Sequence, residues 1–417
     1  MTAVFERWRA EARALGPEAF FAALPDLPFA FLYGEGRFLI LAEDPLLART
    51  EAGDGSLEIE RIGDLPPILP DFIGHATYEH GYGLDPLRPL PLPAEDPIPD
   101  LRLVLYRRVR LYDRETGLLY TGEREARREL EPGRHGLGGG TFRARKIGDS
   151  DPAEAYAGKV ARIREAIAQG EVYQVNLTRQ ERWRWEGGLA SFARRLHDLN
   201  PAPFSALVAD PAWSFVSSSP ESFLEIGEGT LRTRPIKGTA PRSTDPSSDR
   251  ATARDLLDDP KNRSELAMIV DLMRNDLACV CPWGSVRVEA FPRLESYANV
   301  HHLVADVAGA WPGNLRLSDL LKAVFPGGSI TGCPKLAAIR MIRDLEPWPR
   351  RIYTGLLGWC RADLQQAAFG LTIRTAWAWG RELRFGVGGG VVWDSDPRAE
   401  YEETLHKGRS LVQCLSS

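Results

Sequence analysis

Residues 370–387, GLTIRTAWAWGRELRFGV, decide the fold class of this chain. They contain two apolar runs, 370–379 and 383–387, separated by a short break that starts with Gly380. The two expected strands follow one another directly, with no helix between them. Strands that come in sequential runs favour antiparallel sheets with flanking helices, so we predict the α+β class.

The rest of the second half extends this pattern. Apolar alternation predicts strands at 172–178, 215–218, 231–234 and 285–291. Helical periodicity predicts helices at about 247–259, 262–277, 317–323, 334–344 and 398–414. A further helix is expected to begin after Asp151, as its N-cap, and to end at Gly170.

The first 130 residues alternate short apolar runs with proline and glycine breaks. Strands are expected at 38–42 and 101–112, and the proline-rich segment 88–99 is expected to be an extended surface connector. Residues 131–150 hold a glycine cluster without periodicity, which is typical of a linker. We therefore divide the chain into an N-terminal region (1–130), a linker (131–150) and a second region (151–417).

Composition excludes several classes of protein. The chain has 417 residues, of which 43% are hydrophobic and 26% charged, with a formal charge of −5. This is globular composition, and its negative balance argues against non-specific binding to nucleic acid or to an anionic membrane. No long apolar run and no apolar signal-peptide core occur, so we expect no membrane span and a cytosolic location.

A lysine and a row of amides are the first candidates for chemistry. Lys237 in PIKGT (235–239) follows an expected strand, where desolvation would make its amine nucleophilic; a surface-turn lysine is the alternative. The strand 172–178 presents Gln174, Asn176 and Thr178 on one face. That face is either a solvated edge or the lining of a site that needs amides and hydroxyls.

Two glycine-rich segments offer backbone N–H groups. Residues 325–335 (FPGGSITGCPK) open a helix and add the hydroxyls of Ser329 and Thr331, which suits an anion-binding nest but not a Walker A loop. Residues 386–390 (GVGGG) follow a strand without the βαβ context of a dinucleotide fingerprint, so we reject NAD. Close approach of a ligand or a tight turn explains that run.

Isolated charges mark the remaining candidates. Glu265 falls on the apolar stripe of its helix, so it is paired, binds a cation, or is a helix-start carboxylate favoured by the dipole. Arg374, inside an apolar strand, implies an anionic partner, and Tyr353 either offers a phenol to the same anion or packs.

The C-terminal acids and the histidines have ordinary explanations as well. Glu400 and Glu403 share a helix face, as do Glu403 and Lys407, which is usual for a solvated surface. His301 and His302 point to opposite sides of an alternating segment, and an inward histidine is more often a core residue than a catalyst. Together, these features suit a small polycarboxylate substrate with a divalent cation, without fixing the reaction.

An ordered set of segments carries a resemblance to a known family. The segments are GEVYQVNLT, SSSPESF, RPIKGT, ELAMIVDLMRND, VHHLV, FPGGSITGCPK, YTGLLGW, IRT, GVGGGVVWDSDP and AEYEETLHK. Over about residues 151–414 this set resembles the chorismate-utilising enzymes. Residues 1–130 match loosely, through a segment such as Gly74–Tyr82 (GHATYEHGY).

The residues at two positions differ between the branches of that family. Branches that add water carry a lysine where this chain has Gln174, which speaks against isochorismate and salicylate synthesis. The branch that makes anthranilate carries an alanine where this chain has Lys237. The resemblance therefore implies the branch that aminates chorismate to 4-amino-4-deoxychorismate for 4-aminobenzoate and folate synthesis. The anthranilate branch and a catalytically silent, chorismate-binding relative are the alternatives.

The resemblance also implies residue roles. Lys237 would attack C2, Glu221 would protonate the departing C4 hydroxyl, and His302 would lie beside the reacting ring. Glu265 and Glu400 would be ligands of Mg²⁺, which holds the ring carboxylate. The positions implied to contact substrate are Gln174, Thr239, Ser329, Tyr353, Arg374, Gly388, Gly389, Gly390 and Lys407.

The implied fold is a pair of large antiparallel β-sheets packed together and flanked by helices. Residues 1–130 would contribute to the same sandwich, which makes 131–150 a topological boundary. The sequence holds no cysteine nucleophile elbow of a glutaminase. Ammonia is therefore expected from a separate glutamine amidotransferase subunit, and a separate lyase would release pyruvate to give 4-aminobenzoate.

Overall fold

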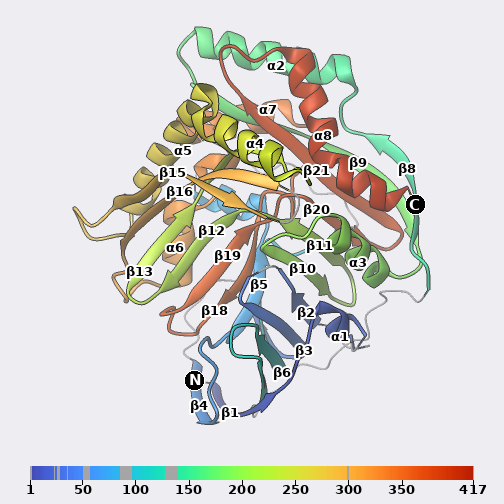
Figure 1. The fold of residues 1–417 in the computed structure, drawn as a ribbon, viewed down its shortest axis with the longest axis vertical. Coiled ribbons are helices and arrows are strands. Elements are labelled where there is room, and N and C mark those ends of the chain that lie inside the picture. Colours follow the sequence, from blue (N-terminus) through green and yellow to red (C-terminus); the bar gives the residue numbers. More distant parts are fainter. Residues whose placement is uncertain are drawn as a thin grey trace.

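The computed structural model describes residues 2–22, 24–25, 29–34, 36–49, 57–84, 96–126, 140–297 and 300–416. In these residues β-strands predominate, and α-helices lie around them (Figure 1). The strands are β1 (Thr2–Ala12), β2 (Phe29–Leu32), β3 (Phe38–Arg49), β4 (Leu57–Gly63), β5 (Phe72–Ala76), β6 (Leu101–Asp113), β7 (Leu118–Ala126), β8 (Arg143–Asp149), β9 (Gln174–Glu186), β10 (Phe204–Ala209), β11 (Ser214–Ser219), β12 (Ser222–Gly227), β13 (Thr230–Arg234), β14 (Ile236–Pro241), β15 (Arg287–Ser296), β16 (Val300–Ala310), β17 (Gly332–Cys333), β18 (Leu356–Cys360), β19 (Ala367–Leu371), β20 (Thr375–Trp379) and β21 (Glu382–Val391).

Eight α-helices and two short 3₁₀ helices occur in the same described ranges. They are α1 (Pro17–Phe21), η1 (Tyr78–Leu84), α2 (Ala153–Ala168), α3 (Leu189–Leu199), α4 (Pro246–Asp258), α5 (Pro260–Ala278), α6 (Leu317–Val324), η2 (Gly328–Ile330), α7 (Lys335–Leu345) and α8 (Pro397–Leu415). None of these helices is both long and apolar enough to span a membrane.

The strand pairings divide at β6 into two arms. The first arm has the order β4-β1-β7-β6-β3-β2-β10-β11-β20-β21-β9-β8, and the second has β6-β5-β18-β19-β12-β13-β16, with β14 and β15 beside β16. The β1–β4 pair is parallel, and every other described pair is antiparallel. This arrangement confirms the predicted α+β class, and the two expected antiparallel sheets are two arms of one hydrogen-bonded sheet joined at β6.

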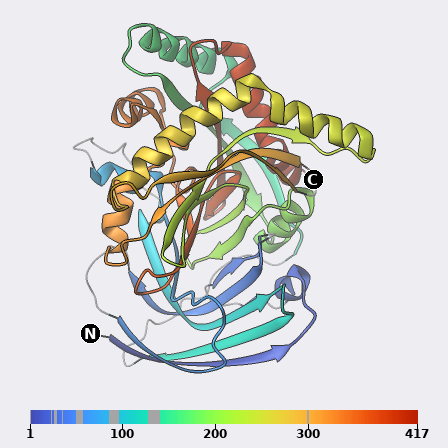
Figure 2. The same cartoon turned by 60° about the vertical axis from the view of Figure 1, so that its left-hand side comes forward.

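Apolar side chains of the two arms pack against each other. One buried cluster joins Ile73 and Leu357 of the second arm to Phe215 and Trp377 of the first. The larger helices gather at the end of the molecule away from the N-terminal strands (Figure 2). There, α8 packs on β21, and α5 packs on β14 and β16. The meeting point of both arms with α5 and α8 is where the candidate site lies.

Aspartate–proline pairs start three of the helices. Asp245, Asp259 and Asp396 each accept a backbone N–H in the first turn of α4, α5 and α8, and proline follows each of them. The expectation that Asp151 caps α2 in the same way is wrong. Pro152 is the N-cap, and the Asp151 carboxylate instead pairs with Lys159.

The predicted strand 370–379 is two strands. Arg374 has a left-handed backbone with φ of 49°, which breaks the run between β19 and β20. Because β19 belongs to the second arm and β20 to the first, the chain crosses between the arms at this point. An arginine at that crossing lies at the junction of the two arms rather than inside one strand.

Part of the expected linker is a strand. Residues 143–149 form β8, an edge strand of the first arm paired with β9. Its exposed arginine and lysine side chains give the segment no alternation of apolar and polar residues, so the sequence pattern does not reveal a strand. Such charges are common on edge strands. Residues 131–139, and residues 88–95 of the expected connector, lie outside the described residues. N-terminal strands enter both arms, since β2 pairs with β10 and β5 with β18.

Candidate active site

A cavity of about 590 Å³ opens between the two arms and beneath α5 and α8. Its walls come from β9 and β21 of the first arm, from β14 and β16 of the second, and from the loops at 220–221, 353–354 and 373–374. Eleven of the predicted site residues line it: Glu221, Lys237, Thr239, Glu265, His302, Ser329, Tyr353, Arg374, Gly388, Gly390 and Lys407. The chain thus brings together side chains that are far apart in sequence.

A bulge in β14 aims Lys237 into this cavity. Lys237 lies opposite Leu303, and the register with β16 shifts between Lys237 and Thr239. Gly238, between them, has φ of 74°, a conformation that favours glycine. A Cβ at Gly238 would also lie 2.9 Å from Cγ of Asn262 on α5. A side chain at this position would therefore be strained and would push the Asn262 side chain away.

Burial shifts the proton equilibria of Lys237 and Glu221 in opposite directions. Desolvation, assisted by the neighbouring Lys407, lowers the pKa of the Lys237 amine, although the carboxylates of Glu265, Glu221 and Glu403 oppose this. Desolvation raises the pKa of Glu221 to about 7, against the effects of Lys237 and of a hydrogen bond from Ser329. Burial therefore moves the pKa of the Lys237 amine down and that of the Glu221 carboxyl up, each toward its neutral form.

His302 is held as a neutral imidazole at the side of the cavity. Its Nδ1 lies 2.9 Å from Oγ1 of Thr239, which is its partner across the β14–β16 ladder. Burial, followed by the nearby Arg374, lowers its pKa to about 4. His301 points to the other side of β16, where its Nε2 lies 3.0 Å from Asp249 of α4. The predicted opposition of the two imidazoles is confirmed.

Arg374 gives the cavity an unneutralised positive charge. Burial lowers its pKa, and no carboxylate among the described residues forms an ion pair with it. The buried phenol of Tyr353 lines the same cavity. Its ring lies so close to β21 that a Cβ at Gly386 would be 2.3 Å from Cδ1, so only glycine fits there. A guanidinium and a phenol in one cavity suit a carboxylate ligand.

Gln174 and Gly389 lie just behind the lining residues. The Gln174 side chain is buried, and its Nε2 has no hydrogen-bond partner. That nitrogen lies 3.0 Å from the position of a Cβ at Gly390, on the cavity wall. An unpartnered buried amide costs free energy unless a ligand accepts from it. The predicted substrate contact Gln174 thus lies behind Gly390, with its Nε2 toward the cavity wall rather than on the lining.

Acidic side chains also face the cavity. Glu265 and Glu403 line it, while Glu400 lies behind Gly389 and accepts a hydrogen bond from Ser395 at 2.6 Å. Burial, and to a lesser extent the neighbouring Glu403 carboxylate, raises the pKa of Glu400. Lys407 pairs with Glu403 at 2.5 Å and donates to the Gly388 carbonyl.

These carboxylates fit a magnesium ion whose remaining coordination positions are filled by a bound substrate and water. The described residues contain no group of three or more histidine, cysteine or acidic side chains arranged to hold a metal by themselves. Mg²⁺ commonly takes one or two carboxylates and fills its remaining positions with water and substrate oxygens. Four acidic side chains line the cavity: Glu221, Asp259, Glu265 and Glu403. Asp259 caps α5 and burial raises the pKa of Glu221, so Glu265 and Glu403 are the carboxylates best placed to face a cation, and the predicted pair Glu265 and Glu400 leaves out Glu403.

Glu403 was therefore underestimated by sequence reasoning, although a signal existed. It lies three residues after Glu400, on the same helix face. Asn176, on the predicted amide face of β9, and Lys261, at the start of α5, also line the cavity. The sequence alone does not say that these positions face inward, because that depends on how α5 and α8 close over the two arms.

Comparisons with known proteins agree with this geometry. The family model of the chorismate binding enzymes matches residues 42–413. An aminodeoxychorismate synthase component 1 of Klebsiella aerogenes is 36% identical over 355 residues, covering 84% of this chain and 78% of that protein. An anthranilate synthase component 1 of Haloarcula marismortui is 41% identical over 262 residues, covering 63% of this chain and 53% of its own length.

A solved structure supports the fold. The menaquinone-specific isochorismate synthase of Escherichia coli superposes with a TM-score of 0.75 at 18% identity, covering 99% of this chain and 95% of that one. At this identity the likeness concerns the fold alone. Since the family model spans most of the sequence, the chain belongs to the chorismate binding enzymes.

Proposed function

We propose that this enzyme aminates chorismate at C4 to form 4-amino-4-deoxychorismate, using ammonia from a separate glutamine amidotransferase subunit. The observation that carries the proposal is Lys237, whose partly buried amine shares one cavity with the buried acid Glu221. The naming of the Klebsiella aerogenes relative as component 1 of an aminodeoxychorismate synthase supports both the reaction and the partner subunit.

The first step needs a nucleophile and an acid at once. The neutral amine of Lys237 forms a bond to C2 while the conjugated double bonds shift and the bond from C4 to its hydroxyl breaks. Glu221 gives its proton to that hydroxyl, which leaves as water. The lowered pKa of Lys237 and the raised pKa of Glu221 are the two shifts that this step requires.

The second step reverses the first with a different nucleophile. Ammonia forms a bond to C4, the double bonds shift back, and the bond between C2 and Lys237 breaks, so that the lysine leaves as a free amine. The Glu221 carboxylate left by the first step accepts a proton from the new ammonium group. The neutral imidazole of His302, whose Nδ1 is held by Thr239, leaves Nε2 to hydrogen-bond an oxygen substituent of the ring.

The charges of the cavity match the two carboxylates of chorismate. Arg374, Tyr353 and the backbone at Gly388–Gly390 suit the enolpyruvyl carboxylate, and the unpartnered amide of Gln174 suits an oxygen of the bound ring. Mg²⁺, held by Glu265 with Glu403 or Glu400, would neutralise the ring carboxylate. Ser329 hydrogen-bonds Glu221 and so fixes the direction of the acid.

Anthranilate formation is the second candidate. The Haloarcula marismortui anthranilate synthase component 1 is more identical to this chain than the Klebsiella aerogenes relative, although over a shorter stretch. Lys237 favours amination at C4, because a covalent lysine at C2 occupies the carbon that ammonia must attack to give anthranilate.

A product assay tests the proposal. The purified protein is incubated with chorismate, Mg²⁺ and an ammonium salt, with and without an aminodeoxychorismate lyase, and the products are separated. We expect 4-aminobenzoate only when the lyase is present. Anthranilate formed without the lyase would contradict amination at C4 and support the second candidate.

A further inference from the structure

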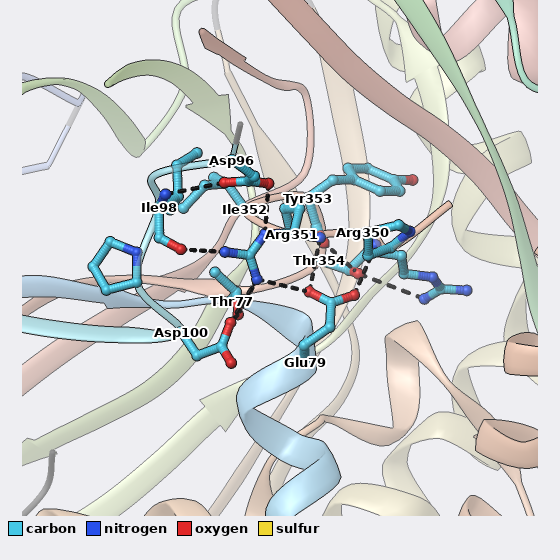
Figure 3. A network of polar contacts seen from close by, with 12 residues as sticks. Thr77, Glu79, Asp96, Ile98, Asp100, Arg350, Arg351, Ile352, Tyr353 and Thr354 are labelled. Carbon is cyan, nitrogen blue, oxygen red and sulfur yellow. Dashed lines mark hydrogen bonds and ion pairs between the residues drawn. The ribbon is translucent and has the colours of Figure 1, made fainter. Parts of the chain in front are cut away.

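The loop between α7 and β18 carries two adjacent arginines that the proposed chemistry does not use. The side chains of Arg350 and Arg351 are each only 1% exposed. Buried guanidiniums are costly unless their N–H groups are paired, so each must serve a fixed set of partners. Figure 3 shows the two side chains leaving the loop in opposite directions.

Glu79 of η1 fixes the backbone of this loop. Its two carboxylate oxygens accept the backbone N–H groups of Arg350 and Arg351 at 2.8 and 2.9 Å (Figure 3). Two hydrogen bonds to one carboxylate leave the loop little freedom to rotate. The directions of both arginine side chains are therefore set by the N-terminal part of the chain.

Arg351 reaches away from the cavity. It donates to Asp96 at 2.9 Å, and also to Asp100 and to the carbonyl of Ile98 (Figure 3). None of these three partners lines the cavity. Arg351 thus ties the segment before β6 to the loop.

Arg350 reaches toward the cavity wall. Its guanidinium forms two hydrogen bonds with Glu346, at 2.7 and 2.8 Å, and lies over the ring of Tyr78. Its two terminal nitrogens also donate to the carbonyl of Asn176 at 2.6 Å and to the carbonyl of Ile330 at 2.8 Å. Both of these residues line the cavity.

These two carbonyls lie on separate parts of the wall. Asn176 belongs to β9, and Ile330 ends η2, directly after Ser329. The chain after η2 also pairs with the start of β9, since the Asn176 N–H donates to the carbonyl of Thr331 at 2.7 Å and β17 lies beside Gln174 and Val175. Arg350 therefore bridges β9 to the segment that presents the Ser329 hydroxyl to Glu221.

We propose that Arg350 is a positioning residue, which holds β9 and η2 at the spacing that aims Asn176 and Ser329 into the cavity. This inference rests on the proposed function in one respect, namely that Glu221 is the acid that Ser329 orients. The planar fork of arginine is needed, because one side chain must satisfy Glu346 and two carbonyls at once.

Arg350→Lys is the main test, since it keeps the charge and removes the fork. We expect kcat for amination with ammonium to fall roughly 10–100-fold with a smaller change in KM, because the reacting groups are displaced rather than lost. A weaker bond from Ser329 also raises the pKa of Glu221, so the alkaline limb of the pH profile moves to higher pH. A merely structural arginine would leave that limb in place.

Arg351→Lys is the matched control. Arg351 is equally buried and equally bonded to acids and a carbonyl, but its partners lie outside the cavity. We expect a comparable shift of the urea midpoint with kcat and the pH profile unchanged. Equal losses of kcat in both variants would overturn the proposal.

Hydrogen exchange supplies a readout that does not depend on turnover. The amide of Asn176 should exchange faster in Arg350→Lys than in the parent or in Arg351→Lys, whereas the amide of Thr77, bonded to the carbonyl of Asp100, should respond to Arg351→Lys. An unchanged exchange rate of the Asn176 amide in Arg350→Lys would contradict the proposal that Arg350 bridges β9 and η2. If the parent protein shows no turnover, the proposed function fails while these rates still decide the bridge.

A double variant covers the case in which Arg350→Lys does not fold. Arg350→Gln with Glu346→Gln removes both buried charges and keeps an acceptor for the Thr178 N–H, which Glu346 now serves at 2.9 Å. The same loss of kcat is expected. Parent-like kcat in a folded double variant would contradict a positioning role.

Discussion

At the scale of single residues, burial raises the pKa of an acid and lowers the pKa of an amine. Glu221 and Lys237 are both desolvated by the same cavity, which favours the neutral form of each. The proposed first step consumes those two neutral forms. Amination should therefore decline as the pH rises above about 7, where Glu221 loses its proton.

Glu221→Gln should separate stability from activity. The pKa of Glu221 is raised to about 7 in the folded state, from an ordinary value near 4.5. Between these values the folded protein keeps a proton that the unfolded chain has released, so stability falls as the pH rises through this window. Above pH 7 the neutral amide should stabilise the protein by up to roughly 3 kcal/mol and abolish turnover.

Urea unfolding at pH 5 and pH 8 checks this expectation. The stabilising effect of Glu221→Gln should be present at pH 8 and nearly absent at pH 5, where the native carboxyl is already protonated. If Glu221→Gln is destabilised equally at pH 5 and at pH 8, the pKa of Glu221 is not raised by burial.

At the scale of elements, the β14 bulge connects backbone conformation to the aim of Lys237. Gly238→Ala would place a side chain at φ of 74° and 2.9 Å from Asn262. The left-handed conformation alone costs about 1–2 kcal/mol, and the contact adds to it. We also expect kcat to fall roughly 10–100-fold, because Lys237 shifts with the bulge.

Gly229→Ala is the control for that change. Gly229 has a similar φ of 70°, but its added Cβ would meet nothing within 4 Å. It should lose only the conformational part of the stability and keep full activity. Equal kcat values for both variants would mean that the bulge does not orient the nucleophile. Thermal unfolding and steady-state kinetics measure the two effects.

Elements with strong local signals were predictable from the sequence. Helices α4, α5 and α8 agree closely with the expected ranges, because aspartate–proline starts and apolar periodicity act locally. β8 was missed because an edge strand carries charges on both faces. The break at Arg374 was missed because a left-handed arginine is stabilised by its place between the arms, which local pattern does not report.

The sequence motifs predicted which residues belong to the candidate site, but not how those residues are arranged in space. Residues such as Lys237 and Glu265 were singled out by motif, whereas the inward position of Glu403 depends on the packing of α8 over β21. Arg350 gave no sequence signal, because a charged residue in a loop looks solvent-exposed until its tertiary partners are known. Contacts between residues far apart in sequence therefore determine which side chains face the cavity, and the motifs alone do not report this.

At the scale of the whole molecule, strands from both ends of the chain complete each arm. β2 pairs with β10 in the first arm, and β5 pairs with β18 in the second. A chain lacking residues 1–139 would expose the edges of β10 and β18 and lose Ile73 from the shared core. It should therefore fail to unfold cooperatively.

Circular dichroism during heating checks this expectation on the shortened and full-length chains. The full-length protein should lose both arms in one transition, because they share β6 and a common core. A shortened chain that unfolds cooperatively and still turns over chorismate would show that residues 140–417 form an independent catalytic unit.

The covalent role of Lys237 is the central claim, and mass spectrometry of the trapped protein tests it most directly. The protein is mixed with chorismate and Mg²⁺ without ammonia, digested, and its peptides are compared with those of Lys237→Ala and of Lys322→Ala, a lysine on α6 outside the cavity. The account predicts a dehydrated chorismate adduct on Lys237, present in Lys322→Ala, absent in Lys237→Ala, and released as 4-amino-4-deoxychorismate when ammonium is added. Amination at C4 by Lys237→Ala at the parent rate, with no adduct on the parent protein, would contradict it.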